Sequence, residues 1–556
     1  MRVARPRRPL AAAALLVAAG VLYLRGLGTS PLLEPDEGRY ASIAREMLAT
    51  GDFVVPRLNG LVYAQKPPLG YWLMAAACRV AGVDERGARL APALAAVATV
   101  GAAAWFGARV FGPSAGLAAA AMLATTPLFY VFGRLAILDV PLTLFLTLAL
   151  VCLYRAAEDA RLRWQLGAGL ALGAAVLTKG LVGLVLPAAV VLAAALVERD
   201  RRFVTRAVLP LLVGLLLAVP WFFAAAARLP GFVRFFLVRH HFERFAVGGK
   251  IGHAHFPGYL VPVLLGGAVP WSLVVVAALV HRGRREWRDR GARALRYVDL
   301  WALVVLAFFS ASRLQIATYV CPAFVPLALR AGAAWFAADR PRWPLVLWTA
   351  LAGATLAGVA LLGAGTHALA TRVLYARWWT QAAAVAAVLG PAAAVVVGGA
   401  LAALAVRRRG VAVVLVAATL AVGLAVVEQA RATFPSYRAL GTIARARGRE
   451  ADRLVTVGRF LQGLPFYARR RTVVVGPPGP LDFGVGFREG RALRWDEARL
   501  VRAWNGRRRL FVVVTPKDWR RLRRRLDRPA TVIAAEHGRV LVTNAPLGVR
   551  PGRAPS

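Results

Sequence analysis

The sequence predicts an α-helical polytopic membrane protein with about 13 membrane-crossing helices and a small C-terminal α/β domain. The chain has 556 residues, of which 59% are hydrophobic and 18% are charged, and its mean hydropathy is +0.58. A soluble chain of this length would carry more charge on several polar domain surfaces. The apolar residues form blocks of about 18 or more, long enough to cross roughly 30 Å of hydrocarbon. After residue 430, short β-branched runs replace these blocks.

The expected crossings follow one another along the first 430 residues. They are the apolar blocks 9–27, 86–111, 113–132, 135–155, 164–178, 180–197, 206–227, 256–280, 297–312, 315–337, 343–364, 379–406 and 411–429. The basic stretch Met1–Arg8 precedes the first block without a small-residue cleavage motif after it, which predicts a retained anchor rather than a signal peptide. Segment 66–80 is short and opens with two prolines, so we expect an interfacial or re-entrant helix there.

The positive charge has the distribution of a membrane protein. The net charge of +44 is scattered in short arginine clusters between apolar blocks, so nucleic acid is excluded as a partner and membrane lipids are expected. The clusters fall in alternate loops, which places those loops in the cytoplasm. With an odd number of crossings, the C-terminal domain then lies on the outer side. Cysteines 78, 152 and 321 are far apart, which supports neither a disulfide framework nor a thiolate metal site.

Two domains are expected. Residues 1–430 form the membrane domain, in which 28–85 is the first outer loop with juxtamembrane helices, and residues 431–556 form the outer α/β domain. The expected strands of that domain are 454–457, 472–475, 510–515, 531–534 and 540–543. Thr515-Pro516-Lys517-Asp518 has the pattern of a helix start. The arginine-rich helix that follows, 519–526, is interpreted as a surface helix facing solvent or lipid headgroups rather than a specific anion site.

The first outer loop is long enough to suggest a function. Proline followed by Asp36 and Glu37 predicts a helix N-terminus, where the helix dipole favours ionised carboxylates. An ordinary charged helix start explains the same residues equally well. The apolar face expected for this helix contains Tyr40, Ile43, Ala44 and Met47.

Further polar candidates fall on the same side of the membrane. Lys66 and Lys179 are two of only four lysines among 71 basic residues, and a compact ammonium suits a phosphate site. Asp139 begins a crossing helix at its outer end, where an acid is a functional candidate or else an ion-pair partner of Arg134. Residues 239–255 contain four of the seven histidines, which could bind metal or phosphate or be inert surface groups. Together these residues predict an outward-facing polar site.

Several motifs resemble GT-C glycosyltransferases of the family 39 and 83 type, which include the aminoarabinose transferases and protein O-mannosyltransferases. The resemblance covers nearly the whole chain and is strongest to the aminoarabinose-transferase branch. The motifs are Pro35-Asp36-Glu37 with Arg39-Tyr40, Tyr63 with Lys66-Pro67 and Gly70-Tyr71-Trp72, Gly133-Arg134 with Leu138-Asp139, Thr178-Lys179-Gly180, His241-Phe242-Glu243-Arg244-Phe245, and Ser310-Ala311-Ser312-Arg313 with Thr318-Tyr319 and Pro322-Ala323-Phe324.

This resemblance implies a bacterial cytoplasmic-membrane enzyme that transfers a sugar from a polyprenyl-phosphate carrier to a lipid or protein acceptor on the periplasmic or exterior side. It implies that Asp36, Glu37 and Asp139 are catalytic. It also implies that the carrier phosphate is bound by Arg39, Tyr63, Lys66, Lys179, Arg313 and Tyr319. Phosphate is the leaving group, so cations directed at it would stabilise the transition state, while a carboxylate takes the acceptor proton. A single displacement would invert the anomeric carbon.

The sequence departs from the family at positions that matter for metal binding. Relatives have Glu immediately before the lysine of the first loop, where this chain has Gln65, and that Glu pairs with the histidine matching His241 in an apparent metal site. A neutral amide is a poor ligand for a divalent cation, so no cofactor is assigned and a divalent metal stays open. Gln315 and Ala317 also replace a family Lys and Pro.

Two other functions share part of the pattern. A transporter or flippase of lipid-linked sugars would have the same helices, but it needs a polar path through the bundle, and the charged candidates lie almost all at the outer face. An oligosaccharide polymerase or ligase differs mainly in the size of its donor. The sequence favours the transferase over both.

Overall fold

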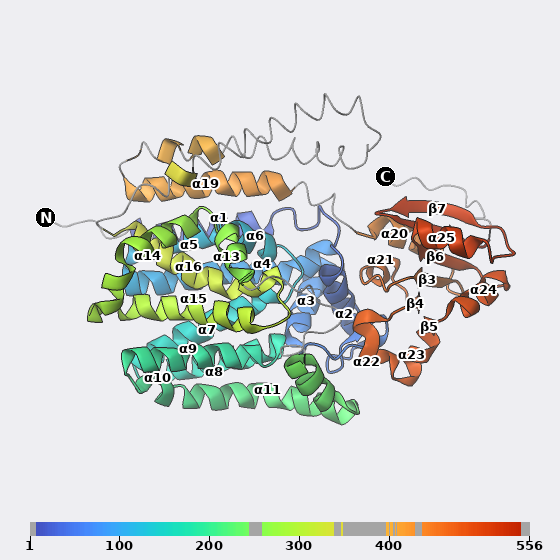
Figure 1. The fold of residues 1–556 in the computed structure, drawn as a ribbon, viewed down its shortest axis with the longest axis horizontal. Coiled ribbons are helices and arrows are strands. Elements are labelled where there is room, and N and C mark those ends of the chain that lie inside the picture. The colour runs from blue at the N-terminus through green and yellow to red at the C-terminus, as the bar shows by residue number, and fades with distance from the viewer. Residues whose placement is uncertain are drawn as a thin grey trace. The chain divides into compact units, whose positions relative to one another are not determined.

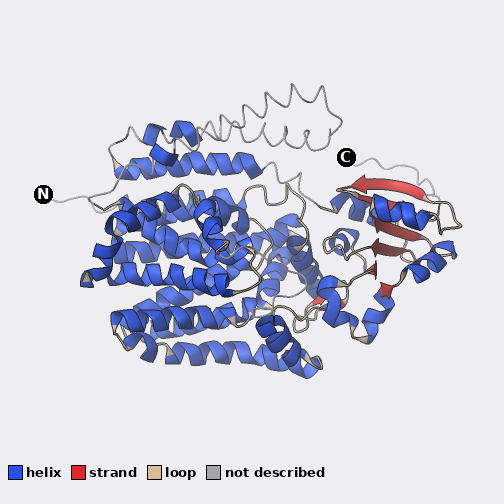
Figure 2. Cartoon of the chain, viewed as in Figure 1, coloured by secondary structure: helices blue, strands red, loops and turns tan. Residues whose placement is uncertain are grey.

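The computed structural model describes residues 7–243, 258–337, 408–428 and 436–545, with short pieces between 346 and 406 (Figure 1). The expected crossings 343–364 and 379–406 fall almost entirely outside the described residues. So do Lys250, His253 and His255. Helices make up most of the described chain, and the strands belong to its later part apart from one small hairpin (Figure 2).

Contacts divide the chain into two compact units. We call Met1–Ser30 with Arg89–Thr433 the helical unit, and Pro31–Ala88 with Phe434–Ser556 the sheet unit. The second unit therefore joins most of the first outer loop to the C-terminal residues, although the sequence grouped 28–85 with the membrane helices. Asn59 shows why this occurs, because its side-chain amide donates to the Thr472 carbonyl and accepts from the Thr472 N–H, both at 2.7 Å.

The helical unit consists of apolar helices joined by short connections. Its elements are α1 (Arg7–Leu24), α4 (Glu85–Phe111), α5 (Pro113–Ala124), α6 (Pro127–Gly133), α7 (Asp139–Glu158), α8 (Leu162–Lys179), α9 (Val182–Glu198), α10 (Arg202–Thr205), α11 (Val208–Arg228), η1 (Arg234–Glu243), α13 (Leu260–Gly267), α14 (Trp271–Arg288), η2 (Arg290–Ala292), α15 (Arg293–Ala311), η3 (Ala317–Ala323), α16 (Phe324–Trp335) and α19 (Arg409–Val427).

Among the described residues, five helices are long and apolar enough to cross a membrane, or up to seven if each bent pair is one span. The bent pairs are α5–α6, at 65°, and α13 with the first part of α14, at 112°. The expected crossings 113–132 and 256–280 are therefore broken rather than straight. The membrane-protein class is confirmed, while the count of 13 stays a prediction.

Small residues bring α8 and α11 of this unit close together, and α8 also packs against α7. A Cβ at Gly169 of α8 would lie 2.5 Å from the Val213 Cβ of α11, and a Cβ at Gly173 would lie 3.0 Å from the Gly214 carbonyl oxygen. Helices in lipid associate through such small-residue contacts, because no hydrophobic effect drives them together. This packing fixes α8 between α7 and α11, and so fixes the position of its last residue, Lys179.

The first helix of the sheet unit is α2 (Asp36–Thr50). The sequence predicted the start of this helix at Asp36. All four residues of the expected apolar face of α2 are buried. A two-residue hairpin, β1 (Arg57–Leu58) and β2 (Leu61–Val62), leads to α3 (Leu69–Ala81). With 13 residues, α3 is a short apolar helix, and its interfacial or re-entrant position stays a prediction.

The C-terminal part of the sheet unit is a six-stranded α/β domain with strand order β5-β4-β3-β6-β8-β7. Strands β5, β4, β3 and β6 are parallel, and β8 pairs antiparallel with β6 and β7. The five expected strands are confirmed, and β5, with two residues, was not predicted. The elements are α20 (Arg438–Arg447), β3 (Arg453–Val457), α21 (Leu464–Ala468), β4 (Thr472–Val475), η5 (Gly479–Leu481), α22 (Asp482–Val485), α23 (Arg488–Leu493), β5 (Arg494–Trp495), α24 (Glu497–Asn505), β6 (Leu510–Val514), α25 (Pro516–Arg523), β7 (Thr531–Glu536) and β8 (Arg539–Thr543).

Helices cover this sheet. Phe511 and Val513 of β6 share a buried core with residues of α20 and α21. Trp504 of α24 meets Trp519 of α25 with ring centroids 5.8 Å apart. The Thr515 hydroxyl accepts from the Asp518 N–H, which confirms the predicted start of α25.

Candidate active site

The first cluster of candidate residues lies in the helical unit and joins Asp139 to Lys179. The Lys179 Nζ lies 2.5 Å from the Asp139 Oδ1, and the two side chains are only 10% and 12% exposed. The same Nζ lies 4.9 Å from the ring centroid of Tyr319. Three residues that the sequence singled out separately are thus brought together.

Helix ends explain this cluster. Asp139 is the first residue of α7 and Lys179 is the last residue of α8. The two helices form an antiparallel hairpin through residues 159–161, so the start of one lies beside the end of the other. A carboxylate at a helix N-terminus and an ammonium at a C-terminus are both favoured by the helix dipole. Each charge of this buried ion pair is therefore compensated by the other charge and by the helix backbone.

Arg134 is not the partner of Asp139. Its guanidinium donates to the Leu22 and Tyr23 carbonyls at 3.0 and 2.8 Å, and its Nε lies 3.5 Å from Glu428. Its role is to tie neighbouring segments of the helical unit together. Asp139 therefore faces a lysine, the cation that the resemblance assigns to the carrier phosphate.

The second cluster lies in the sheet unit and centres on Arg39. Its Nη1 lies 3.0 Å from the Asp36 Oδ1 one helical turn earlier. Its Nε donates to the Gln462 side-chain oxygen, and its guanidinium lies 5.6 Å from the Tyr40 ring centroid. Burial acts to lower the pKa of Arg39, but Tyr63 and Asp36 outweigh it, so the pKa is raised and the side chain stays cationic. The Asp36 side chain is 46% exposed and so remains accessible.

The loop carrying Gln462 is held against α2 by backbone contacts. Glu34 accepts from the N–H groups of Gln462 and Gly463, and the Ser42 hydroxyl donates to the Gln462 carbonyl. A Cβ at Gly38 would lie 2.4 Å from the Gly463 Cα, so only glycine permits this approach. The sequence analysis missed Gln462 and Glu34 as site residues. Gln462 lies 423 residues from Arg39 in a loop without a motif, so no local signal identifies it.

Gln65 has both ends of its amide engaged. Its oxygen accepts from the Tyr63 hydroxyl at 3.0 Å, and its NH₂ donates to the Pro480 carbonyl at 3.2 Å. A carboxylate could not make the second bond because it has no donor. These contacts do not fit a divalent cation at Gln65. Within the described chain, no group of three or more His, Cys, Asp or Glu residues could hold a metal ion.

The remaining predicted residues have diverse positions. Lys66 is half-buried just before α3, and Arg313 is exposed in the connection between α15 and η3. Glu37 is 2% exposed and accepts from the Leu33 N–H at 2.9 Å, so its carboxylate supports the turn before α2. His241 lies in η1, but its side chain falls outside the described part of the chain.

Family models match two segments of the chain. Residues 65–225 match the dolichyl-phosphate-mannose-protein mannosyltransferase model, and residues 441–544 match the aminoarabinose transferase C-terminal domain. The first segment contains Asp139 and Lys179. The second contains Gln462 and all six strands of the larger sheet.

Curated relatives extend this match. An undecaprenyl phosphate-alpha-4-amino-4-deoxy-L-arabinose arabinosyl transferase of Pseudomonas paraeruginosa is 37% identical over 325 residues, which is 57% of this chain and 58% of the relative. A transferase of the same name from Aeromonas salmonicida is 33% identical over 316 residues, 56% of this chain and 57% of the relative. The matched part thus spans somewhat more than half the length of these curated relatives.

Solved structures match nearly the full length. The crystal structure of ArnT from Cupriavidus metallidurans bound to undecaprenyl phosphate has a TM-score of 0.84 and 27% identity, covering 96% of this chain and 98% of that one. The apo state of the same protein gives a TM-score of 0.82. In fold and in both matched segments, this chain is similar to the aminoarabinose transferases, which are glycosyltransferases of the GT-C type.

Proposed function

We propose that this protein is an integral membrane glycosyltransferase that moves a sugar from a polyprenyl-phosphate carrier to a lipid or protein acceptor, with inversion at the anomeric carbon. The observation that carries the proposal is the likeness, over 96% of the chain, to a transferase structure whose title records bound undecaprenyl phosphate. The names of the curated relatives make 4-amino-4-deoxy-L-arabinose the first donor sugar to test. Its place is the bacterial cytoplasmic membrane, with the site and the C-terminal domain facing the periplasm or exterior.

The side chains suit the two charges that such a transfer creates. The leaving phosphate gains negative charge as the glycosidic bond breaks, and Lys66 and Arg39 are the cations proposed to stabilise it. The acceptor hydroxyl loses a proton, which the accessible carboxylate of Asp36 can take. Lys179 and Tyr319 lie beside Asp139 in the helical unit, and we propose that Lys179 and Tyr319 are also carrier-phosphate ligands. Arg313 and Tyr63 are further proposed ligands of the carrier phosphate, and Glu37 acts on catalysis through the turn that it holds.

The test is transfer by the purified full-length protein in detergent from undecaprenyl phosphate-linked 4-amino-4-deoxy-L-arabinose to an added bacterial membrane-lipid extract as acceptor, followed as release of the free carrier phosphate. Asp36→Asn keeps the side-chain shape but removes the base, so we expect turnover to fall roughly 10²–10⁴-fold with carrier binding retained. Lys66→Ala should weaken carrier binding as well as turnover, and Lys66→Arg should restore only part. Glu450→Gln, at an exposed acid of the sheet unit, is the matched control.

Two outcomes would contradict the proposal in different ways. If Asp36→Asn keeps near wild-type turnover, Asp36 is not the base. If the wild type does not use this donor but releases carrier phosphate from another polyprenyl-phosphate sugar, the proposed sugar is wrong and the proposed reaction class stands.

We also propose that the transfer needs no divalent metal. The support is the engagement of Gln65 by Tyr63 and Pro480, which leaves no carboxylate at the position where relatives have Glu. An excess of EDTA in the same assay should leave most of the activity in place, and His241→Ala should be milder than Asp36→Asn. Complete inhibition by EDTA that added metal reverses would contradict this.

A further inference from the structure

A cavity of about 530 Å³ lies in the sheet unit, entirely within its C-terminal α/β domain. Its volume falls in the range of pockets that hold small ligands, roughly 300–1,000 Å³. None of its lining residues belongs to the clusters around Arg39 and Asp139. The lining residues are Val457, Gly458, Val475, Gly476, Arg494, Trp495, Asp496, Glu497 and Arg521.

The position of the cavity follows from the topology of the sheet. Val457, Val475 and Trp495 are the last residues of three adjacent parallel strands, β3, β4 and β5. The chain passes from β3 outward to β4 and β5, and then returns to the other side of β3 as β6. Open α/β sheets bind ligands outside the carboxyl ends of their strands, where the direction of winding reverses. The cavity lies at that edge.

Two glycines form bare backbone at the floor of the cavity. Gly458 and Gly476 follow β3 and β4 with φ of +91° and +128°, a region that other residues avoid. A Cβ at Gly476 would lie 3.0 Å from the Gly458 carbonyl oxygen, so the two turns are in contact. This contact keeps side chains out of the space between the strand ends and leaves room for a ligand.

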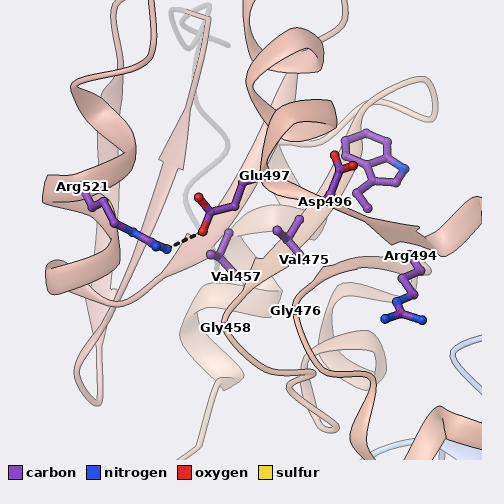
Figure 3. Close-up of a pocket in the computed structure, with 9 residues that line it drawn as sticks. Val457, Gly458, Val475, Gly476, Arg494, Asp496, Glu497 and Arg521 are labelled. Atoms are coloured by element: carbon purple, nitrogen blue, oxygen red, sulfur yellow. Dashed lines mark hydrogen bonds and ion pairs between the residues drawn. The ribbon is translucent and has the colours of Figure 1, made fainter.

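The walls of the cavity carry charge of both signs and an indole. In Figure 3, the Arg521–Glu497 pair lies on one side of the glycine turns and Arg494 on the other. The Arg494 side chain is exposed, and no hydrogen bond or ion pair engages its guanidinium among the residues that the structure describes. Trp495 is half-buried, and the Arg499 guanidinium 5.1 Å from its ring centroid braces it.

These groups do not suit a nucleotide. Dinucleotide-binding sheets hold pyrophosphate with backbone N–H groups of a glycine-rich turn and the N-terminus of the first helix. Here the helix after β3, α21, has only five residues. The turn after β4 contains Pro477, Pro478 and Pro480, which have no N–H to donate. The turns after β3 and β4 therefore offer little to an anion, and Arg494 is the side chain placed to bind one.

We propose that this cavity binds a sugar unit that carries a phosphate. The guanidinium of Arg494 is suited to bidentate contact with phosphate oxygens. Glu497 and Asp496 offer carboxylate oxygens as acceptors for sugar hydroxyls, and the Trp495 indole offers an apolar face for the sugar ring. The same headgroup exists as a free sugar phosphate and as part of a phosphorylated glycolipid. The site is separate from the proposed donor site.

The test is equilibrium binding of radiolabelled α-D-glucose 1-phosphate to the full-length protein in detergent, with glucose and inorganic phosphate as competitors. We expect glucose 1-phosphate to bind at least about tenfold more tightly than either competitor, because only it satisfies both halves of the site. Arg494→Gln should weaken binding about tenfold or more through loss of charged hydrogen bonds. Trp495→Ala should weaken it as well, and Trp495→Phe, which retains an aromatic ring, should recover part.

Two control variants make the result specific to this cavity. Arg491→Gln removes an exposed arginine from the neighbouring α23 and should leave binding unchanged. Lys66→Ala reports any binding at the proposed carrier-phosphate site. Loss of binding in the Arg494 and Trp495 variants but in neither control supports the proposal. Equal binding in all variants, loss in Lys66→Ala alone, or no preference over inorganic phosphate would overturn it.

A last arm identifies the source of the sugar. A decyl phosphodiester of glucose in mixed micelles displaces the label at lower concentration than free glucose 1-phosphate if the ligand is a lipid headgroup. The reverse order identifies a free sugar phosphate. Because this measurement needs no sugar transfer, its failure and the failure of the proposed function are distinguishable.

Discussion

At the scale of single residues, the pair of Asp139 and Lys179 combines a structural with a chemical role. Both side chains are nearly buried and lie 2.5 Å apart. Removing one partner of such a pair leaves an uncompensated charge and costs roughly 3–5 kcal/mol, whereas removing both can be nearly neutral. Stability and activity should therefore respond differently to single and double substitution.

We expect Asp139→Asn and Lys179→Met each to lower the apparent Tm in detergent, and the double variant to recover most of that loss. Turnover should stay low in all three, because Asp139→Asn removes the carboxylate that positions Lys179, and the other two variants remove the counter-charge of the carrier phosphate. Lys517→Met, at an exposed lysine, is the control. A double variant that regains both stability and turnover would show that the pair has only a structural role.

Glu34 predicts a pH dependence of stability. Burial raises its pKa to about 7, although hydrogen bonds from the Gly463 and Gln462 N–H groups act in the opposite direction. The folded protein therefore holds this proton more tightly than the unfolded chain does, and stability falls as the pH rises from about 5 to about 8. The contribution is at most about 3 kcal/mol.

The Glu34→Gln variant should lack this part of the pH dependence. The measurement is the apparent Tm of both proteins at several pH values. The result is the difference between the slopes of Tm against pH for the wild type and the variant. We expect the wild type to lose more than the variant between pH 5 and pH 8. Parallel curves would show that Glu34 does not titrate in this window.

At the scale of elements, the contact of α2 with the loop at Gln462 decides where Arg39 points. Gly38 and Ser42 are spaced four residues apart on α2, so they present one face to this loop, and Glu34 contacts the same loop from just before the helix. The predicted helix start at Asp36 is only the local part of this arrangement. The loop supplies the Gln462 oxygen that fixes the guanidinium.

Gly38→Ala tests this contact. The new Cβ would lie 2.4 Å from the Gly463 Cα, and forcing a backbone apart in this way costs about 1–3 kcal/mol. We expect a lower apparent Tm and weaker carrier binding, because Gln462 moves away from Arg39. Gly20→Ala in α1 has open space around its Cβ and should be neutral or slightly stabilising. Equal behaviour of the two variants would contradict the close approach.

At the scale of the whole molecule, the arginine-rich loops predict which side each part of the chain faces. Phe53, in the first outer loop, is 40% exposed. Arg285 is an exposed residue near the end of α14, within the stretch 281–296 that holds seven arginines. A cysteine at position 53 should react with an impermeant thiol reagent in intact cells, and one at position 285 should not. The reverse labelling would invert the topology. Of the native cysteines, Cys78 and Cys321 are buried, and the wild type measures the background.

Patterns within a few residues are sufficient to predict most of the elements. The apolar face of α2, the short α3, five strands and the capped start of α25 all follow from periodicity and from the chemistry of helix ends. Strand β5 was missed, because two residues are too short to show a period of two. The bends at α5–α6 and α13–α14 were missed too, because an apolar block looks the same whether or not it is broken.

The sequence by itself determined the membrane class, the α/β domain and the residue types of a charged outer site. Only the tertiary structure decided that Lys179, 40 residues away, pairs with Asp139, and that Arg39 is held by Gln462, 423 residues away. It also decided that Pro31–Ala88 packs with the C-terminal residues in one unit. The physical reason is that local propensity and hydropathy act over a few residues. Partners across the fold depend instead on how helix faces, strand ends and glycine contacts fit together in space.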